Sequence, residues 1–176
     1  MEESARDGVD RMQAAWNQVR PELDTVPMGV VGRLLRAAPL VLASCEAYLA
    51  PHDLSRAEFD IVSALTRSGR PLSPGELSRE LLFTGPATTK RLRRLEDGGW
   101  IVRDVNPEDA RGFLIAPTPD GARRFDALLP GYLAHEASLI AMLDADQQEQ
   151  VGDLLRTLLG SWERSTSDPQ RRAPGS

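Results

Sequence analysis

The sequence predicts a mainly α-helical fold with one small β-hairpin, and three observations support this prediction. Apolar residues recur at helical spacing over most of the chain. Two short helical patterns follow each other closely between residues 73 and 97. Two short apolar runs, separated by a polar turn, come directly after them and predict paired strands. Long apolar helical segments flank this central region on both sides.

The composition is that of an ordinary globular chain. It has 176 residues, of which 27% are charged and 41% hydrophobic, and its net charge is −5. The single cysteine, Cys45, excludes an internal disulfide framework, and the two histidines leave no cluster of zinc ligands. No apolar run approaches the roughly 20 residues that span a bilayer, and the charged start does not resemble a signal peptide. We therefore expect a cytoplasmic protein without a membrane segment.

The first helix of the central pair is predicted from its starting residues. Ser73 is a candidate N-cap, Pro74 fits the first helical position, and Glu76 completes a capping box. Leucines follow at helical spacing, and the helix is expected to end near Phe83. The gap to the next helix is only a few residues long, as in a helix-turn-helix.

The second helix carries a basic segment that interrupts an otherwise acidic chain. Thr84 and Pro86 predict its start, two glycines after Asp97 predict its end, and no acid occurs from residue 85 to residue 95. Leu92 and Leu95 lie on one face and are expected to be buried. The other faces carry the side chains that we expect to contact DNA, namely Thr88, Thr89, Lys90 and Arg93, within the basic run that also includes Arg91 and Arg94. A merely solvated basic face is the alternative.

A hairpin is predicted next, with strands near residues 100–102 and 112–115 and a polar turn at residues 106–109. Arg111 lies where the chain returns, and a cation there is placed to enter a DNA minor groove. In the alternative interpretation Arg111 pairs with Asp109 and holds the hairpin together, and both remain open. Two helices followed by such a wing form a winged helix-turn-helix, which places a helix in a major groove.

A series of short motifs extends through this region. They are Leu54-Ser55, Phe59-Asp60, Leu72-Ser73, Glu76-Leu77, Thr89-Lys90-Arg91, Leu95-Glu96, Gly99, Asp109, Arg111 and Pro117-Thr118-Pro119-Asp120-Gly121. Together they resemble the MarR family of winged-helix transcriptional regulators. The family usually has a basic residue at the position of Ala110, so this wing is less basic than the family pattern.

The resemblance implies the organisation of the whole chain. Residues 1–53 would hold an extra N-terminal helix and a long apolar helix over residues 29–50, in which Pro39 predicts a kink. Residues 54–117 would form the winged helix-turn-helix lobe. Residues 118–165 would form C-terminal helices, over residues 119–143 and 146–163, that interlock with the long helix of a second chain in a homodimer. Residues 166–176 are polar and expected to be disordered.

The N-terminal segment places Trp16 in the extra helix, which resembles the urate-responsive subgroup of the family. That subgroup's ligand pattern of one Trp, one Asp and two Arg falls on Trp16, Asp60, Arg91 and Arg103. An aromatic ring and two guanidinium groups suit a small anion of the urate, purine or polycarboxylate type. Contact between Asp60 and Arg91 would then link the ligand to the DNA-binding helix. Plain packing of Trp16 and a structural ion pair for Asp60 are the alternatives.

The function expected from these observations is a dimeric, ligand-responsive DNA-binding regulator, and a repressor in particular. The alternative is a winged-helix module for protein–protein interaction, which the acidic net charge favours. The sequence holds no nucleophile–base pair, phosphate-binding loop or set of metal ligands, so we expect neither an enzyme nor a cofactor. Cys45 has no His or Lys near it in sequence to activate its thiolate, and we expect it to be buried and inert.

Overall fold

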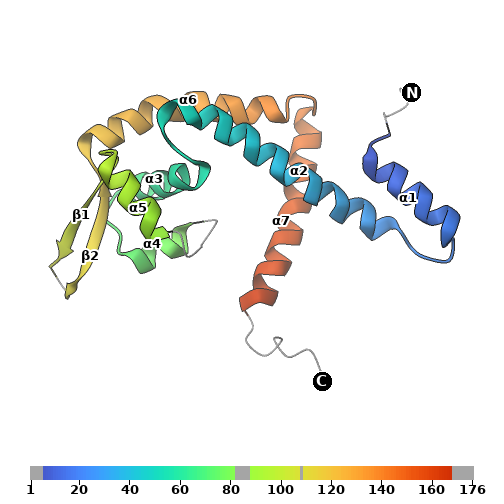
Figure 1. Cartoon of the computed structure of the whole chain (residues 1–176), viewed down its shortest axis with the longest axis horizontal. Coiled ribbons are helices and arrows are strands. Elements are labelled where there is room, and N and C mark those ends of the chain that lie inside the picture. Colours follow the sequence, from blue (N-terminus) through green and yellow to red (C-terminus); the bar gives the residue numbers. More distant parts are fainter. Residues whose placement is uncertain (1–5, 82–87, 108, 168–176) are drawn as a thin grey trace, which may run out of the picture. The chain divides into compact units, whose positions relative to one another are not determined.

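The computed structural model describes residues 6–81, 88–107 and 109–167, and Figure 1 shows its helices and strands. These residues form two compact units, Met1–Tyr132 and Leu133–Ser176, which are described separately. The elements are α1 (Gly8–Val19), α2 (Val26–Leu49), the 3-10 turn η1 (Ala50–His52), α3 (Arg56–Ser68), α4 (Pro74–Glu80), α5 (Thr88–Asp97), β1 (Ile101–Asn106), β2 (Asp109–Pro117), α6 (Pro119–Leu139) and α7 (Ala145–Ser167). The predicted mainly helical fold with one hairpin is confirmed.

The helices of the winged lobe begin and end where their local sequence stabilises termini. In α4, the Ser73 hydroxyl accepts a hydrogen bond from the Glu76 backbone N–H, and the Glu76 carboxylate accepts one from the Ser73 N–H. This confirms the predicted capping box. At the other end of the pair, α5 stops at Asp97, where Gly99 adopts a φ of 70° that other residues rarely take. The predicted start of α5 at Thr84 and Pro86 lies outside the described residues.

The hairpin extends further than the sequence predicted. Strands β1 and β2 are antiparallel, with Arg103 opposite Ile115. Leu72, which precedes α4, exchanges two backbone hydrogen bonds with Ile115, of 2.9 and 2.8 Å. This bridge adds a third extended segment beside β2 and ties the base of the wing to the helix pair.

The core of the lobe comes from one face of each element. Leu92 and Leu95 of α5 are 3% and 1% exposed, as predicted. They share the core with residues of α3, α4, β1 and β2, namely Phe59, Ile61, Val62, Leu65, Leu77, Ile101 and Ile115. At the entry to α6, Thr118 caps the helix, and a Cβ at Gly121 would collide with the Trp100 carbonyl. This close approach requires glycine and seats α6 on the lobe.

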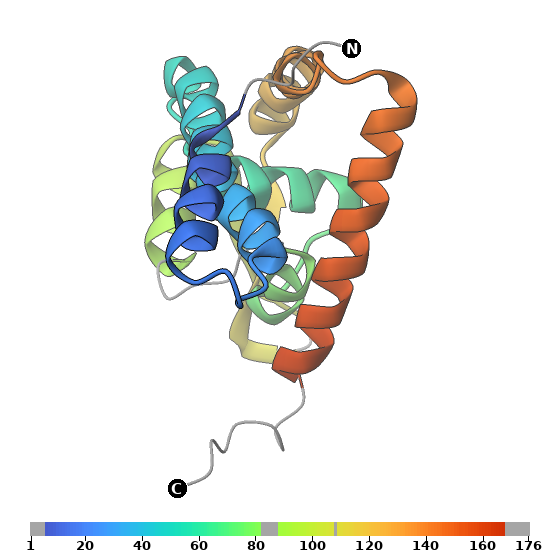
Figure 2. The ribbon, with the colours of Figure 1, turned by 90° about the vertical axis from the view of Figure 1, so that its right-hand side faces the viewer.

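Helix α1 lies along the first part of α2, as Figures 1 and 2 both show. Val9 is buried between them, and Arg33 of α2 forms ion pairs with Asp7 and Asp10 at 3.0 and 2.6 Å. Much of the remaining surface of α2 is apolar and exposed. The helix continues through Pro39, and the kink expected there stays a prediction.

The expectation that no segment is apolar and long enough to cross a membrane was wrong. Residues Val26–His52 meet that criterion by length and composition, with a mean hydropathy of 1.5 in their most apolar window. Arg33 and Arg36 interrupt the apolar run in the sequence, but the part that follows them carries no charge until Glu46. A helix that packs against another protein chain meets the same criterion of length and composition as a membrane helix, so the criterion does not distinguish the two.

The second unit contains the end of α6 and α7. Helix α6 ends at Leu139, earlier than the predicted residue 143, and a Ser138 side-chain hydrogen bond to the His135 carbonyl lies in its last turn. Helix α7 extends to Ser167, past the predicted end at residue 163, and the Ser165 hydroxyl bonds to the Ser161 carbonyl there. Residues 166 and 167, predicted to belong to a disordered tail, are therefore helical, and residues 168–176 lie outside the described part.

Candidate nucleic-acid interface

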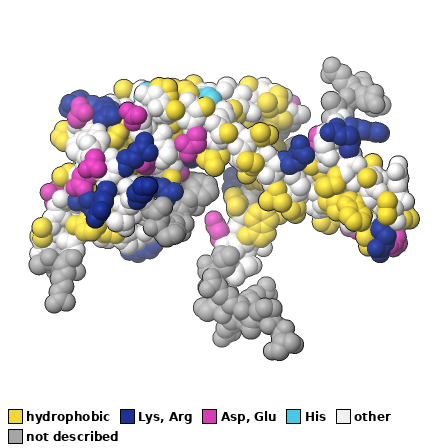
Figure 3. All heavy atoms as spheres, in the orientation of Figure 1, with side chains coloured by type: hydrophobic (Ala, Val, Ile, Leu, Met, Phe, Trp, Pro, Cys, Tyr) yellow, Lys and Arg dark blue, Asp and Glu magenta, His cyan; other side chains and the backbone are white. Residues whose placement is uncertain are grey.

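The outer face of α5 carries three of the side chains expected to contact DNA. Thr89, Lys90 and Arg93 are exposed, opposite the buried Leu92 and Leu95. Thr88 is half-buried at the first described position of the helix. Lys and Arg side chains gather over this part of the lobe in Figure 3. The structure thus places a basic, hydroxyl-containing helix face on the surface.

Arg94 does not belong to that face, although it continues the basic run. Its side chain turns back toward the start of α3, where its Nε lies 3.6 Å from Glu58 Oε1 and its Nη2 donates to the Asp53 carbonyl at 3.3 Å. Arg94 therefore binds acceptors of its own chain, although its side chain stays 60% exposed. The Glu58 carboxylate that attracts Arg94 lies 36 positions earlier in the chain, out of reach of a local sequence pattern.

Arg103 is already engaged within the lobe. Its Nε donates to Glu96 Oε2 on α5 at 2.8 Å, its Nη2 donates to the same oxygen, and its guanidinium lies over the Phe113 ring. The hydrogen bond from Arg103 lowers the pKa of Glu96, and the bond to Glu96 raises that of Arg103. The Arg103 guanidinium is therefore paired with a carboxylate of α5.

The expected contact between Asp60 and Arg91 is not formed among the described residues. Asp60 Oδ1 instead accepts from Arg56, one turn earlier on α3, at 3.0 Å. The two residues are four positions apart, so the pair forms locally on the helix surface. Arg91 is half-buried on α5. The second Asp60 oxygen, Oδ2, is buried and accepts no hydrogen bond within the described structure.

Arg56 also lies at the centre of a half-buried polar cluster, which the sequence analysis did not predict. Its Nη1 donates to the Tyr132 hydroxyl at 2.6 Å and lies 3.9 Å from the sulfur of Cys45. Burial disfavours the charged guanidinium, but the hydrogen bond and charge of Asp60 keep the pKa of Arg56 above its ordinary value. Cys45 is buried, as expected. The i, i+4 spacing of Arg56 and Asp60 was the sequence feature that could have revealed the pair.

Trp16 and Arg111 complete the predicted set. Trp16 is 44% exposed and lies beside Met12, Ala15 and Val19 in a shallow apolar depression on α1. It is therefore not packed into the core of this chain. Helix α1 packs on α2, whereas Arg103 of β1 contacts α5 and β2, so the described chain does not join these two residues. Arg111 lies on β2, and its side chain and that of Asp109 are outside the described part.

Known proteins resemble this chain in sequence and in fold. A model of the MarR family matches residues 52–112, from η1 to the return strand of the wing. The HTH-type transcriptional regulator PecS of Dickeya dadantii is 30% identical over 151 residues, which cover 85% of this chain and 89% of PecS. The chain belongs to the MarR family. A HTH-type transcriptional repressor of Mycobacterium tuberculosis is also 30% identical, over 77% of this chain and 95% of its own length.

The fold agrees with a solved MarR structure. A crystal structure of a MarR variant from E. coli in complex with operator DNA has a TM-score of 0.63 and 27% identity, and covers 82% of this chain and 97% of that one. MarR-family relatives are named as transcriptional regulators, so the expectation that this chain is not an enzyme is confirmed. In this chain α4 and α5 are consecutive helices followed by the hairpin β1–β2, which is the order of a winged helix-turn-helix.

Proposed function

We propose that the protein is a dimeric repressor of transcription that binds a pseudo-palindromic operator and releases it when a small anionic metabolite binds. The exposed face of α5 is the observation that carries the DNA-binding part, because it presents Thr89, Lys90 and Arg93 beside a hairpin wing. The E. coli relative was solved on operator DNA with the same fold. We propose that Thr88 joins these contacts and that Arg111 reaches toward the minor groove.

The test is a salt titration of binding to the DNA upstream of the protein's own gene. Each phosphate contact that is lost lowers the slope of log affinity against log salt by about one unit. Lys90→Met and Arg93→Met should each do this, and Arg111→Met should have a smaller effect if Asp109 holds that side chain. Unchanged slopes in all three variants would show that α5 and the wing do not face DNA.

A protein–protein module is the competing function, and the net charge of −5 is the observation that favours it. Retention on heparin followed by a gel shift separates the two. A regulator binds both heparin and its operator, and an interaction module without DNA contact binds neither at physiological salt.

The homodimer is proposed from the exposed apolar residues of α2. Val30, Val31, Leu35, Val41 and Leu42 are between 48% and 71% exposed in the single chain. Figure 3 shows hydrophobic side chains gathered over α1 and α2. An apolar surface of this extent marks an interface. A dimer would present two copies of α5 about one DNA turn apart, roughly 34 Å. In this proposal α2 packs against protein in the cytoplasm and does not enter a membrane.

Ligand control is proposed at Trp16, Asp60, Arg91 and Arg103, as in the urate-responsive subgroup. In this proposal the ligand acts on the DNA-binding helix through Arg103 and Glu96, and not through an Asp60–Arg91 pair. An anion that takes the Arg103 guanidinium would release Glu96, which lies on α5. The buried Asp60 Oδ2 lacks a donor, and a purine-type N–H would satisfy it. Trp16 and Arg103 of one chain contact different elements. We therefore propose that Trp16 of one chain and Arg103 of its partner line the same pocket in the dimer.

A further inference from the structure

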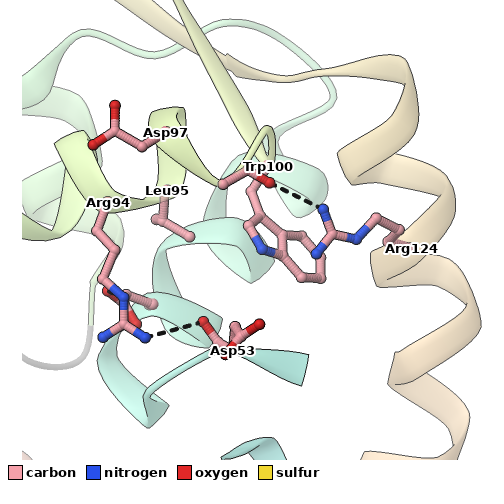
Figure 4. Close-up of a pocket in the computed structure, with 8 residues that line it drawn as sticks. Asp53, Arg94, Leu95, Asp97, Trp100 and Arg124 are labelled. Atoms are coloured by element: carbon pink, nitrogen blue, oxygen red, sulfur yellow. Dashed lines mark hydrogen bonds and ion pairs between the residues drawn. The ribbon is translucent and has the colours of Figure 1, made fainter. Parts of the chain in front are cut away.

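A cavity of about 350 Å³ lies beneath the C-terminal half of α5, and Figure 4 shows the residues around it. It is lined by Asp53, Glu58, Arg94, Leu95, Asp97, Gly98, Trp100 and Arg124. These residues come from three places in the sequence: the junction between α2 and α3, the end of α5 with the following turn, and the first turns of α6. The cavity thus lies where the DNA-binding helix meets the rest of the lobe.

Arg94 connects α5 to the α2–α3 junction. Its guanidinium reaches the Asp53 carbonyl and the Glu58 carboxylate, as Figure 4 shows for the Asp53 contact. Asp53 has a φ of 54° and is the one non-glycine residue with positive φ in the described part of the chain. That conformation is unfavourable for most residues and is tolerated best by Asp and Asn. The carbonyl that accepts from Arg94 therefore belongs to a tightly constrained turn.

The Glu58 carboxylate is held in place from the other side. Its side chain is 3% exposed, against 60% for Arg94. Glu58 Oε2 accepts hydrogen bonds from the Ser55 N–H at 2.8 Å and the Ser55 hydroxyl at 2.7 Å, which close the capping box of α3. Only Oε1 faces Arg94. A fixed carboxylate and a constrained carbonyl give Arg94 two rigid acceptors on elements other than its own.

Arg124 supports the same end of α5 through its terminal turn. Its Nη1 donates to the Gly98 carbonyl at 3.1 Å, and its guanidinium lies 3.8 Å from the centre of the Trp100 ring. Trp100 is only 3% exposed, so its ring is covered and does not offer a stacking surface. Both arginines around the cavity therefore bind groups of the protein and connect the end of α5 to α3 and α6.

We propose that Arg94 is a positioning residue: it fixes α5 on the α2–α3 junction and raises operator affinity without contacting DNA. The proposal rests on the proposed function, in which the outer face of α5 binds DNA. A helix held in its binding orientation loses less freedom on association than one that rotates on its base. Since α2 ends at this junction, Arg94 also joins the proposed dimer helix to the DNA-binding helix.

The salt titration distinguishes positioning from contact, because its slope counts phosphate contacts. Arg94→Met should weaken operator binding roughly fivefold, the upper range for a partly exposed ion pair, and leave the slope unchanged within about a third of a unit. The neighbouring Arg93→Met should lower both affinity and slope. Arg123→Met is the matched control for lost charge, since Arg123 is 71% exposed on α6 and pairs with Asp120. It should change neither.

Glu58→Gln tests the route through the junction. Glutamine keeps the capping box of α3 but lacks the charge that attracts Arg94. Arg94→Met should therefore weaken DNA binding less in the Glu58→Gln background than in the wild type. Arg94→Lys should recover part of the affinity, since an ammonium group keeps the charge but not the planar fork.

Each failure points to a different part of the proposal. A slope that falls by about one unit in Arg94→Met would mean that Arg94 contacts phosphate, and unchanged affinity would mean that it has no role. A full effect of Arg94→Met in the Glu58→Gln background would exclude Glu58 as the anchor. The first two results overturn the positioning role, and the third overturns the part of it that Glu58 carries. Normal affinity and slope in Arg93→Met and Lys90→Met would instead contradict the proposed function itself.

Discussion

The winged lobe buries its large apolar side chains, whereas helix α2 leaves many of its own exposed. In the lobe, Leu77 and Leu95 are 0% and 1% exposed, whereas Leu35 and Leu40 of α2 are 71% and 72% exposed. The lobe completes its core within one chain, and α2 does not. The difference indicates two layers of stability: one set by packing within the lobe, and one that depends on what covers the long helices.

The largest effect should come from the lobe. Leu95→Ala removes a fully buried side chain beneath the DNA-binding helix and should destabilise the protein by about 3 kcal/mol in urea denaturation. Leu35→Ala is the matched control, because it removes the same atoms from a position exposed in the single chain. Its effect should appear only as a change in the concentration dependence of unfolding. Equal, concentration-independent losses in both variants would contradict the division into two layers.

The ligand experiment asks whether the two regions are coupled. In a thermal-shift screen of urate, purines and small polycarboxylates, a ligand at about 100 times its dissociation constant should stabilise the dimer by about 2.7 kcal/mol. Trp16→Ala and Arg103→Met should each abolish that shift. Glu96→Gln should strengthen binding, because it weakens the competitor for Arg103.

A mixture of Trp16→Ala and Arg103→Met, the two variants expected not to bind the ligand, tests whether the pocket uses residues of both chains. If Trp16 of one chain serves Arg103 of its partner, a Trp16→Ala and Arg103→Met heterodimer keeps one intact site and regains half of the binding stoichiometry. If both residues act within one chain, the heterodimer has no intact site. No recovery in the mixture would place the pocket within a single chain, and a normal shift in both single variants would exclude these residues.

The dimer interface should respond to charge on α2. Leu35→Glu places a carboxylate in the exposed apolar face and should weaken dimerisation at least about tenfold, as measured by sedimentation equilibrium. Operator affinity should fall with it, because in the proposed dimer each monomer reads one half-site. Arg67→Ala on α3, exposed and outside the proposed interface, makes the net charge more negative by the same one unit and should leave dimerisation unchanged. A wild-type protein that is monomeric at micromolar concentration would contradict the interface.

Features that depend on neighbouring residues were predictable from the sequence, and features that depend on distant ones were not. The capping box of Ser73 and Glu76 and the buried pair Leu92 and Leu95 follow from spacings of three residues. The inward turn of Arg94 depends on Glu58, and the occupied state of Arg103 depends on how β1 folds back beside α5. Neither arrangement is encoded in a local pattern.

The predicted contact between Asp60 and Arg91 was wrong for a different reason, and the ligand-binding role of Asp60 stays a prediction. Its partner Arg56 is four residues away, and that spacing favours an ion pair on a helix. The family pattern pairs Asp60 with Arg91 on α5, whereas in the structure the local i, i+4 pair on α3 is the one that forms. A subgroup pattern names residues that matter together, but it does not say which of them touch.

The smallest expected effect compares two helix starts, that of α4 in the winged lobe and that of α7. In α4, hydrogen bonds from the Ser73 backbone and the Arg70 side chain lower the pKa of Glu76 to about 2. A lowered carboxyl pKa stabilises the fold above the ordinary value near 4.5, and this contribution is lost as the pH falls toward 2. The start of α7 uses a similar reciprocal pair, Asp144 with Gln147, in which the glutamine does not titrate.

Glu76→Gln should therefore make α4 resemble the start of α7. The glutamine side chain still accepts from the Ser73 N–H, so the helix start is kept, but protonation no longer weakens it. Hydrogen exchange of the α4 amides at pH 5 and pH 3 provides the measurement. Protection corrected for intrinsic exchange should fall between these values more in the wild type than in the variant, while α7 amides behave alike in both. Equal losses in α4 would show that the Glu76 charge does not stabilise this helix, and that the shape of the capping box alone is sufficient.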